Sequence, residues 1–173
     1  MKLVLSLITL LLLTSNCEAQ LKKFENAVAY NDYIIGEQLK IGKAIQEFNN
    51  IFTTSSDTNI IHLARVTIKS QADSSVKLVK LMQPFKADTV LKKAAINLFT
   101  FYARSAANEY TQLIRISYND NLSNEEKRKQ LEAIVKTITD AEAIVDKNFS
   151  DAQKVFAAKH GFKLTENDFK INE

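Results

Sequence analysis

The sequence contains little of what marks disulfide-rich or β-sheet proteins. Its 173 residues include one cysteine, one proline, three glycines and no tryptophan. A single cysteine excludes a disulfide within the chain, and so few glycines and prolines argue against the frequent turns of an all-β fold. We therefore expect a helical domain that is held together by its apolar core.

The sequence also lacks the motifs of the common metal, haem and nucleophile sites. The only histidines, His62 and His160, are isolated, and neither follows a glutamate by three residues as in di-iron bundles. The sequence has no C-x-x-C-H motif, no His/Cys cluster, no G-x-S-x-G elbow and no glycine-rich phosphate loop. We predict that the protein is not an enzyme and that it holds no metal or cofactor.

The charge of the chain is nearly balanced, with 23 lysines and arginines against 20 aspartates and glutamates. Nucleic-acid-binding proteins typically cluster arginines with aromatic residues, whereas most basic residues here are lysines. This composition favours a solvated surface of mixed charge and no nucleic-acid partner.

The first residues have the pattern of an export signal. Lys2 precedes an uncharged apolar run from Leu3 to Thr14, which is shorter than the ~20 residues that a membrane-spanning helix needs. We expect residues 1–19 to be a signal peptide cleaved after Ala19, and the protein to be exported to the periplasm, the cell surface or the extracellular space. Cys17 would then be a small residue of the cleavage region, discarded with the signal.

Cys17 also permits a second interpretation of the same segment. As a lipobox cysteine it would be lipidated after removal of residues 1–16 and would tether the protein to a membrane. Asn16 departs from the small residue that usually precedes a lipobox cysteine. Both interpretations stay open at this point.

Four amphipathic segments follow, each with apolar residues at the spacing of three and four that is typical of a helix face. Short polar turns between them predict antiparallel neighbours. We therefore predict an all-α fold, an elongated up-down-up-down four-helix bundle over residues 20–162, followed by a polar tail over residues 163–173. The predicted helices cover residues 21–52, 59–82, 89–118 and 124–160.

Local signals mark several of the predicted helix ends. Pro84 ends the second helix, and Asp88 is a candidate N-cap for the third. Ser123 and Glu126 match a capping box, and Gly161 matches a C-cap that Phe162 can close by packing back. His160 is interpreted as a cation at the end of the last helix.

Two charged residues interrupt the apolar faces. Glu37 and Glu109 both fall on predicted core stripes, and buried carboxylates are costly unless they are paired. Together with Tyr30 and Tyr102 they are candidates for a small polar ligand pocket. The alternative is that the glutamates lie partly exposed at the bundle edge while the tyrosines only pack.

The segment from Tyr30 to Gln38, YNDYIIGEQ, sits in a helical chain behind an export signal. In this it resembles uncharacterised bacterial surface lipoproteins of the spirochaete and Bacteroidota type. The resemblance implies lipid attachment at Cys17 and no particular activity.

Two hypotheses about function follow. The first is a non-enzymatic exported bundle that acts at the cell surface or in the periplasm through contacts with a protein partner. The alternative is a bundle that binds a small molecule in the polar Tyr/Glu pocket. Exposed apolar residues on one face would favour the first hypothesis, and an enclosed cavity at Glu37 and Glu109 would favour the second.

Overall fold

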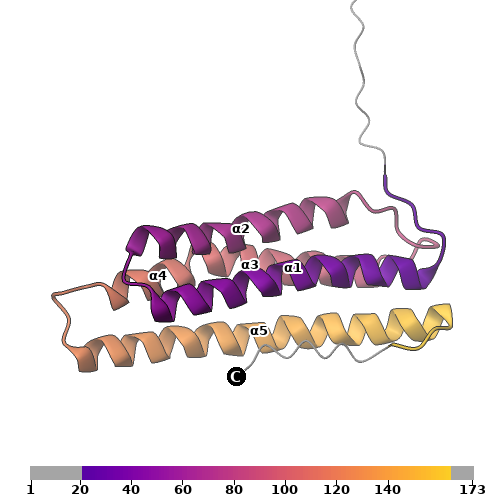
Figure 1. Ribbon diagram of the computed structural model, residues 1–173. Coiled ribbons are helices and arrows are strands. Elements are labelled where there is room, and N and C mark those ends of the chain that lie inside the picture. The colour runs from indigo at the N-terminus through magenta and orange to yellow at the C-terminus, as the bar shows by residue number, and fades with distance from the viewer. Residues whose placement is uncertain (1–20, 165–173) are drawn as a thin grey trace, which may run out of the picture.

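A computed structural model describes residues 21–164, and it confirms the predicted all-α four-helix bundle (Figure 1). Two arms of the elongated bundle run in one direction and two in the other. The third arm consists of two consecutive helices in line, α3 and α4. The helices are α1 (Ala27–Thr54), α2 (Thr58–Lys80), α3 (Val90–Ala107), α4 (Glu109–Ser117) and α5 (Asn124–His160).

The ends of α5 follow the predicted capping chemistry. The Ser123 hydroxyl accepts a hydrogen bond from the Glu126 N–H, and the Glu126 carboxylate accepts one from the Ser123 N–H, which completes the capping box. Gly161 ends the helix with φ of 72°, a left-handed conformation that favours glycine. The ring of Phe162 packs back on Phe156, as predicted.

The prediction that the first helix begins at Leu21 was wrong. The helix begins at Ala27, where Asn26 caps it by accepting a hydrogen bond from the Ala29 N–H at 2.8 Å. The residues before it are not helical, and the Lys22 backbone bonds to the segment after α2 through the Leu81 carbonyl and the Gln83 N–H, both at 2.9 Å. This pairing with a distant segment competes with helix formation.

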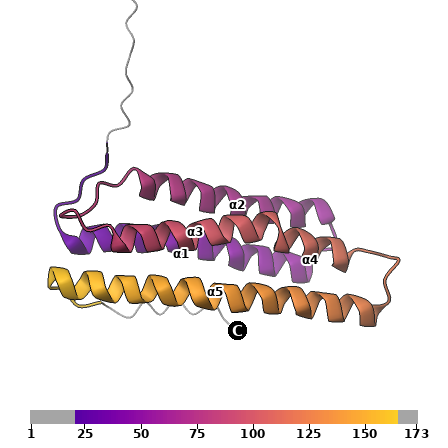
Figure 2. The same cartoon turned by 180° about the vertical axis from the view of Figure 1, so that it is seen from behind.

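The third predicted helix is interrupted, which the sequence did not predict. Asn108 separates α3 from α4 with φ of −108° and ψ of −75°. Arg65 of α2 donates a hydrogen bond to the Ala106 carbonyl oxygen at 3.0 Å, two residues before the break. A side chain that takes a helix carbonyl in this way distorts the helical hydrogen-bond ladder, and Asn is a weak helix former. Figure 2 shows α3 and α4 as one interrupted arm beside α5.

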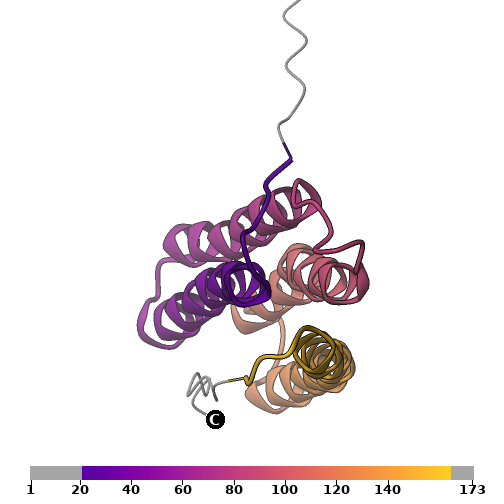
Figure 3. The same cartoon turned by 90° about the vertical axis from the view of Figure 1, so that its right-hand side faces the viewer.

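The core lies between α1, α2 and α3, and α5 covers it from one side. Viewed end-on, α2 packs against both α1 and α3, while α5 packs mainly against α3 and α4 and contacts α1 little (Figure 3). All residues of the core cluster lie between Phe24 and Phe162. The chain from Gln20 onward therefore contains every core residue found within residues 21–164, and we expect it to fold without the residues before it.

Several predictions fall outside the described residues. These are the signal peptide over residues 1–19, lipid attachment at Cys17 and most of the polar tail, residues 165–173. Among the helices that the structure does describe, none is both long and apolar enough to cross a membrane.

Candidate functional site

Tyr30 lies near the start of α1, in an aromatic cluster at one end of the bundle. It is fully buried, and its ring packs on those of Phe24, Phe85 and Phe156 at centroid distances of 5.2, 5.9 and 5.4 Å. Burial, with the nearby Asp88 carboxylate, raises the pKa of its hydroxyl to about 12. Among residues 21–164, this hydroxyl has no hydrogen-bond partner.

Glu37 is buried between α1 and α2, with 2% of its side chain exposed. One carboxylate oxygen accepts a hydrogen bond from the Ser75 hydroxyl at 2.8 Å, and the other accepts from Lys40 at 2.5 Å. The hydrogen bond to Glu37 raises the pKa of Lys40. The charge on the apolar face is therefore paired within the two helices.

Tyr102 joins α3 to α5. Its hydroxyl donates a hydrogen bond to Glu142 at 2.8 Å. Burial raises the pKa of Tyr102, with the Glu142 carboxylate adding to the shift, and the same two causes raise the pKa of Tyr110 to about 12. Glu142 itself was not among the residues selected from the sequence, because it lies beside the apolar stripe of its helix and not on it.

Glu109 is the first residue of α4 and is half-buried. One of its carboxylate oxygens is buried and has no hydrogen-bond partner within the described part of the chain. The hydrogen bonds of Glu37 and Tyr102 go to different partners on different helices. Three surface cavities lie on α5, between α1 and α5, and between α1 and α2. None of these three is lined by Tyr30, Glu37, Tyr102 or Glu109.

Asp88 and His160 form a buried polar contact where α5 ends. His160 packs between Phe85 and Phe156, and its Nε2 lies 3.4 Å from an Asp88 oxygen. His160 lies in the last turn of α5, as predicted, and its side chain is buried there, with 7% exposed. Burial alone would raise the pKa of Asp88, but the hydrogen bond from the Val90 N–H and the nearby Lys159 ammonium lower it. The N-cap of α3 is Thr89 and not Asp88 as predicted, although the Asp88 carboxylate accepts the N–H of Val90, the first helix residue, at 3.0 Å.

An open cavity of about 400 Å³ lies between α1 and the end of α5. The amides of Asn31 and Gln153 meet at its wall and are joined by a hydrogen bond of 2.9 Å. Asp32 and Lys163 supply opposite charges, and Phe162 is part of the apolar lining. The predicted packing of Phe162 was the one sequence signal for this cavity.

An apolar groove lies between the last turns of α1 and the first turns of α2. Its lining on α1 includes Ala44 and Ile51, and on α2 it includes Ile60 and Leu63. Leu63 is 66% exposed and Ile60 48% exposed. Large apolar side chains that stay this exposed beside a groove are typical of an interaction surface.

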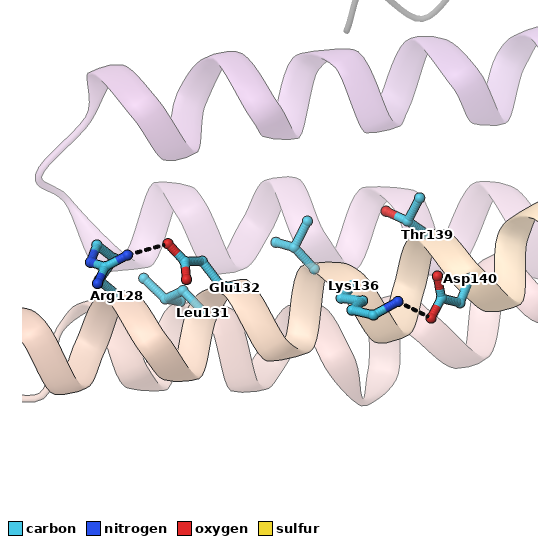
Figure 4. Close-up of a pocket in the computed structure, with 7 residues that line it drawn as sticks. Arg128, Leu131, Glu132, Lys136, Thr139 and Asp140 are labelled. Carbon is cyan, nitrogen blue, oxygen red and sulfur yellow. Dashed lines mark hydrogen bonds and ion pairs between the residues drawn. The ribbon is translucent and has the colours of Figure 1, made fainter.

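A third, shallow depression lies on the surface of α5 and is lined by residues of this helix alone (Figure 4). Leu131 lies among charged residues that are paired along the helix, Arg128 with Glu132 and Lys136 with Asp140, both at 2.7 Å. Because all its lining residues belong to one helix, no second element encloses a ligand there.

The Glu142 carboxylate is expected to make stability depend on pH. Burial raises the pKa of Glu142, and the Asp146 carboxylate raises it further. The hydrogen bond from Tyr102 lowers it in part, so the pKa stays above its ordinary value. A raised pKa means that the folded chain binds this proton more tightly than the unfolded chain, so stability falls as pH rises from the ordinary carboxyl range through the raised pKa. Glu142→Gln should therefore be more stable than the unchanged chain at neutral pH.

Urea denaturation of both proteins checks this expectation. The advantage of Glu142→Gln should shrink as the pH is lowered through the raised pKa, because the unchanged carboxyl then becomes neutral as well. Glu47→Gln, at an exposed glutamate of α1, is the control and should show no such pH-dependent advantage. An advantage for Glu142→Gln that stays constant with pH would contradict the prediction.

Neither metal-ligand groups nor similar proteins assign a function to these sites. Within residues 21–164, no group of three or more His, Cys, Asp or Glu side chains could hold a metal ion. No protein-family model, curated protein or solved structure matches the chain.

Proposed function

We propose that the protein is a non-enzymatic exported helical bundle that binds a partner protein at the cell surface or in the periplasm. The observation that carries the proposal is the apolar groove between α1 and α2. Ile60 and Leu63 line this groove and expose large apolar side chains to water. Polar residues at these positions would be better solvated. Burying apolar surface is worth about 25 cal/mol per Å², so a partner that covers them gains affinity.

The occupant that fits this groove is an amphipathic helix of the partner. Apolar residues line both walls at helical spacing, Ala44 and Ile51 on α1, and Ile60 and Leu63 on α2. A groove between two antiparallel helices accepts a third helix through apolar side chains at such spacings. Glu47 and Thr67 supply polar groups within the lining.

Export is the second part of the proposal and rests on the sequence alone. Lys2 and the apolar run from Leu3 to Thr14 support a secretory signal, and Cys17 supports either its cleavage region or a lipid tether. Intact-mass analysis of the protein from its host separates these. A chain that starts at Gln20 would exclude the tether, and a diacyl or triacyl adduct on Cys17 would exclude the soluble form.

Binding of a small molecule is the second candidate function, and the cavity between α1 and α5 favours it. Its volume of about 400 Å³ lies within the range of ligand sites. Asp32, Lys163 and the Asn31 amide beside Phe162 would suit a small ligand with both charged and apolar parts. This cavity replaces the Tyr/Glu pocket as the place to test that function.

Photo-crosslinking from the groove tests the partner directly. A photoreactive residue at position 63 should give one dominant adduct in the host, and the same residue at position 100, where Thr100 is exposed on α3, should not. With the purified partner, Leu63→Glu should weaken binding at least about 10-fold, because it removes about 2 kcal/mol of apolar burial and places a charge in the groove.

The outcomes of the crosslinking are distinct. No adduct at position 63, or the same adduct at both positions, would overturn the groove as the binding site. An adduct of two copies of this chain would assign the groove to self-association instead of a separate partner.

A further inference from the structure

One end of the bundle concentrates lysines that lie far apart in the sequence. Three segments meet there: residues 21–26 before α1, residues 77–93 from the end of α2 to the start of α3, and residues 159–164 after α5 (Figures 1 and 3). We call this region the lysine end. The only acidic residues in these segments are Glu25 and Asp88.

Most lysines of this region are free to contact a partner. Asp88 is engaged by Lys159 at 2.9 Å, and Lys92 donates to the carbonyl oxygens of Lys80 and Met82. The remaining lysines are exposed and, among residues 21–164, make no ion pair. They are Lys22, which lies over the Tyr33 ring, and Lys23, Lys77, Lys80, Lys86, Lys93 and Lys163.

Exposed apolar side chains lie among these lysines. Leu21 is 50% exposed, Leu81 38% and Val90 47%. Leu21 is next to Lys22, whose backbone bonds to Leu81, so the first two belong to one surface. Lysines that surround exposed leucines suit the boundary between charged headgroups and apolar chains of a lipid bilayer.

The opposite end of the bundle has no such excess of positive charge. Residues 47–60, which join α1 to α2, contain Glu47 and Asp57 and no lysine or arginine. Between α4 and α5 both signs are mixed, and Arg128 there bonds to Glu125 and Glu132. The chain, with a net charge of only +3, is therefore polarised along its long axis.

We propose that the lysine end binds the surface of an anionic lipid bilayer. Each lysine close to such a surface strengthens binding roughly fivefold, and the attraction acts within a Debye length. Leu21, the first residue that the structure describes, precedes Lys22, whose backbone bonds to Leu81 and Gln83 at this end. Four residues lie between Cys17 and Lys22, and the five steps of chain span at most about 18 Å, so a lipid on Cys17 would hold this same end at the bilayer.

The proposal does not depend on that lipid or on the partner groove. If Cys17 is removed with the signal, the lysines and leucines act alone, and binding is reversible. If Cys17 is lipidated, they orient a protein that is already anchored. Failure of the groove proposal would leave this surface unaffected, because the groove lies toward the other end of α1 and α2.

Vesicle binding by the chain from Gln20 tests the surface. We expect binding to vesicles that contain phosphatidylglycerol, no binding to pure phosphatidylcholine vesicles, and release as salt is raised. The triple variant Lys23→Gln, Lys80→Gln and Lys93→Gln should bind roughly 100-fold more weakly. The matched control removes the same charge elsewhere with Lys43→Gln, Lys127→Gln and Lys129→Gln, and should bind within about twofold of the unchanged chain.

A fluorescent label reports which end meets the bilayer. The chain from Gln20 contains no cysteine, so Gln83→Cys at the lysine end and Asn121→Cys before α5 each accept one polarity-sensitive dye. The dye at position 83 should shift to a less polar environment on binding, and the dye at position 121 should not.

Three results would overturn the proposal. Equal affinity for neutral and anionic vesicles would show that binding is not electrostatic. An equal loss of vesicle affinity in both triple variants would show that binding is not located at the lysine end. Tight, salt-sensitive binding to soluble polyphosphate without binding to anionic vesicles would assign the lysine end to a soluble polyanion. A circular dichroism spectrum for each variant shows whether it has kept its helical fold.

Discussion

Replacing Phe156 by alanine is expected to lower the free energy of unfolding by about 3–5 kcal/mol. Phe156 is 1% exposed, and its ring packs on Tyr30 of α1, Phe85 of the α2–α3 connection, and His160 and Phe162 at the end of α5. One side chain therefore joins α1, the α2–α3 connection and the end of α5. Its loss would leave a cavity that these aromatic neighbours cannot fill without moving.

Thermal and urea denaturation of the chain from Gln20 measure this effect. The loss corresponds to a fall in melting temperature of about 10 °C for a domain of this size. Val155→Ala is the matched control, because Val155 is the preceding residue and is 56% exposed; it should change stability by less than about 0.5 kcal/mol. A similar loss in both variants would show that Phe156 has no special role in packing.

The second large effect is expected at the buried contact between Glu37 and Ser75. Ser75→Ala should cost about 2–3 kcal/mol, because it removes the hydroxyl that donates to a carboxylate with 2% exposure. Adding Glu37→Leu should recover most of this loss, because no buried charge then lacks its partner. The hydrogen bond between Glu37 and Ser75 would then contribute to the free energy of unfolding only when both residues are present.

A double-mutant cycle by urea denaturation checks this coupling. Ser74→Ala, at the exposed neighbouring residue, should stay within about 0.5 kcal/mol of the unchanged chain. If the double variant is as unstable as Ser75→Ala alone, the loss comes from packing at position 75 and not from the carboxylate. Stability that Ser75→Ala leaves unchanged would show that Lys40 alone satisfies Glu37.

The helices could be predicted because their signals are local. Apolar spacing marks a helix face, and Ser123, Glu126 and Gly161 satisfy backbone groups of their own helix. The pairing of Lys22 with the chain after α2 joins residues that only the completed fold brings together. The break at Asn108 likewise depends on a side chain from another helix, so neither feature has a periodic pattern to reveal it.

The same distinction applies to the candidate sites. The burial of Glu37 follows from its place on the apolar stripe, but its partner Ser75 belongs to another helix. The lysine end is invisible in the total charge, because lysines in three separate segments are offset by acidic residues elsewhere. Composition sums over the chain, whereas a binding surface depends on which segments the topology places side by side.

The uninterrupted course of α5 sets a standoff distance. Its 37 residues form one straight rod of about 55 Å, with Lys159 near one end and Arg128 near the other. A bundle that stands on a bilayer with the lysine end would hold its far end several tens of ångströms away, above the layer of lipid headgroups. The groove at Leu63 would then be accessible to partners in solution or on a facing surface. The length of α5 would set the distance between this groove and the bilayer.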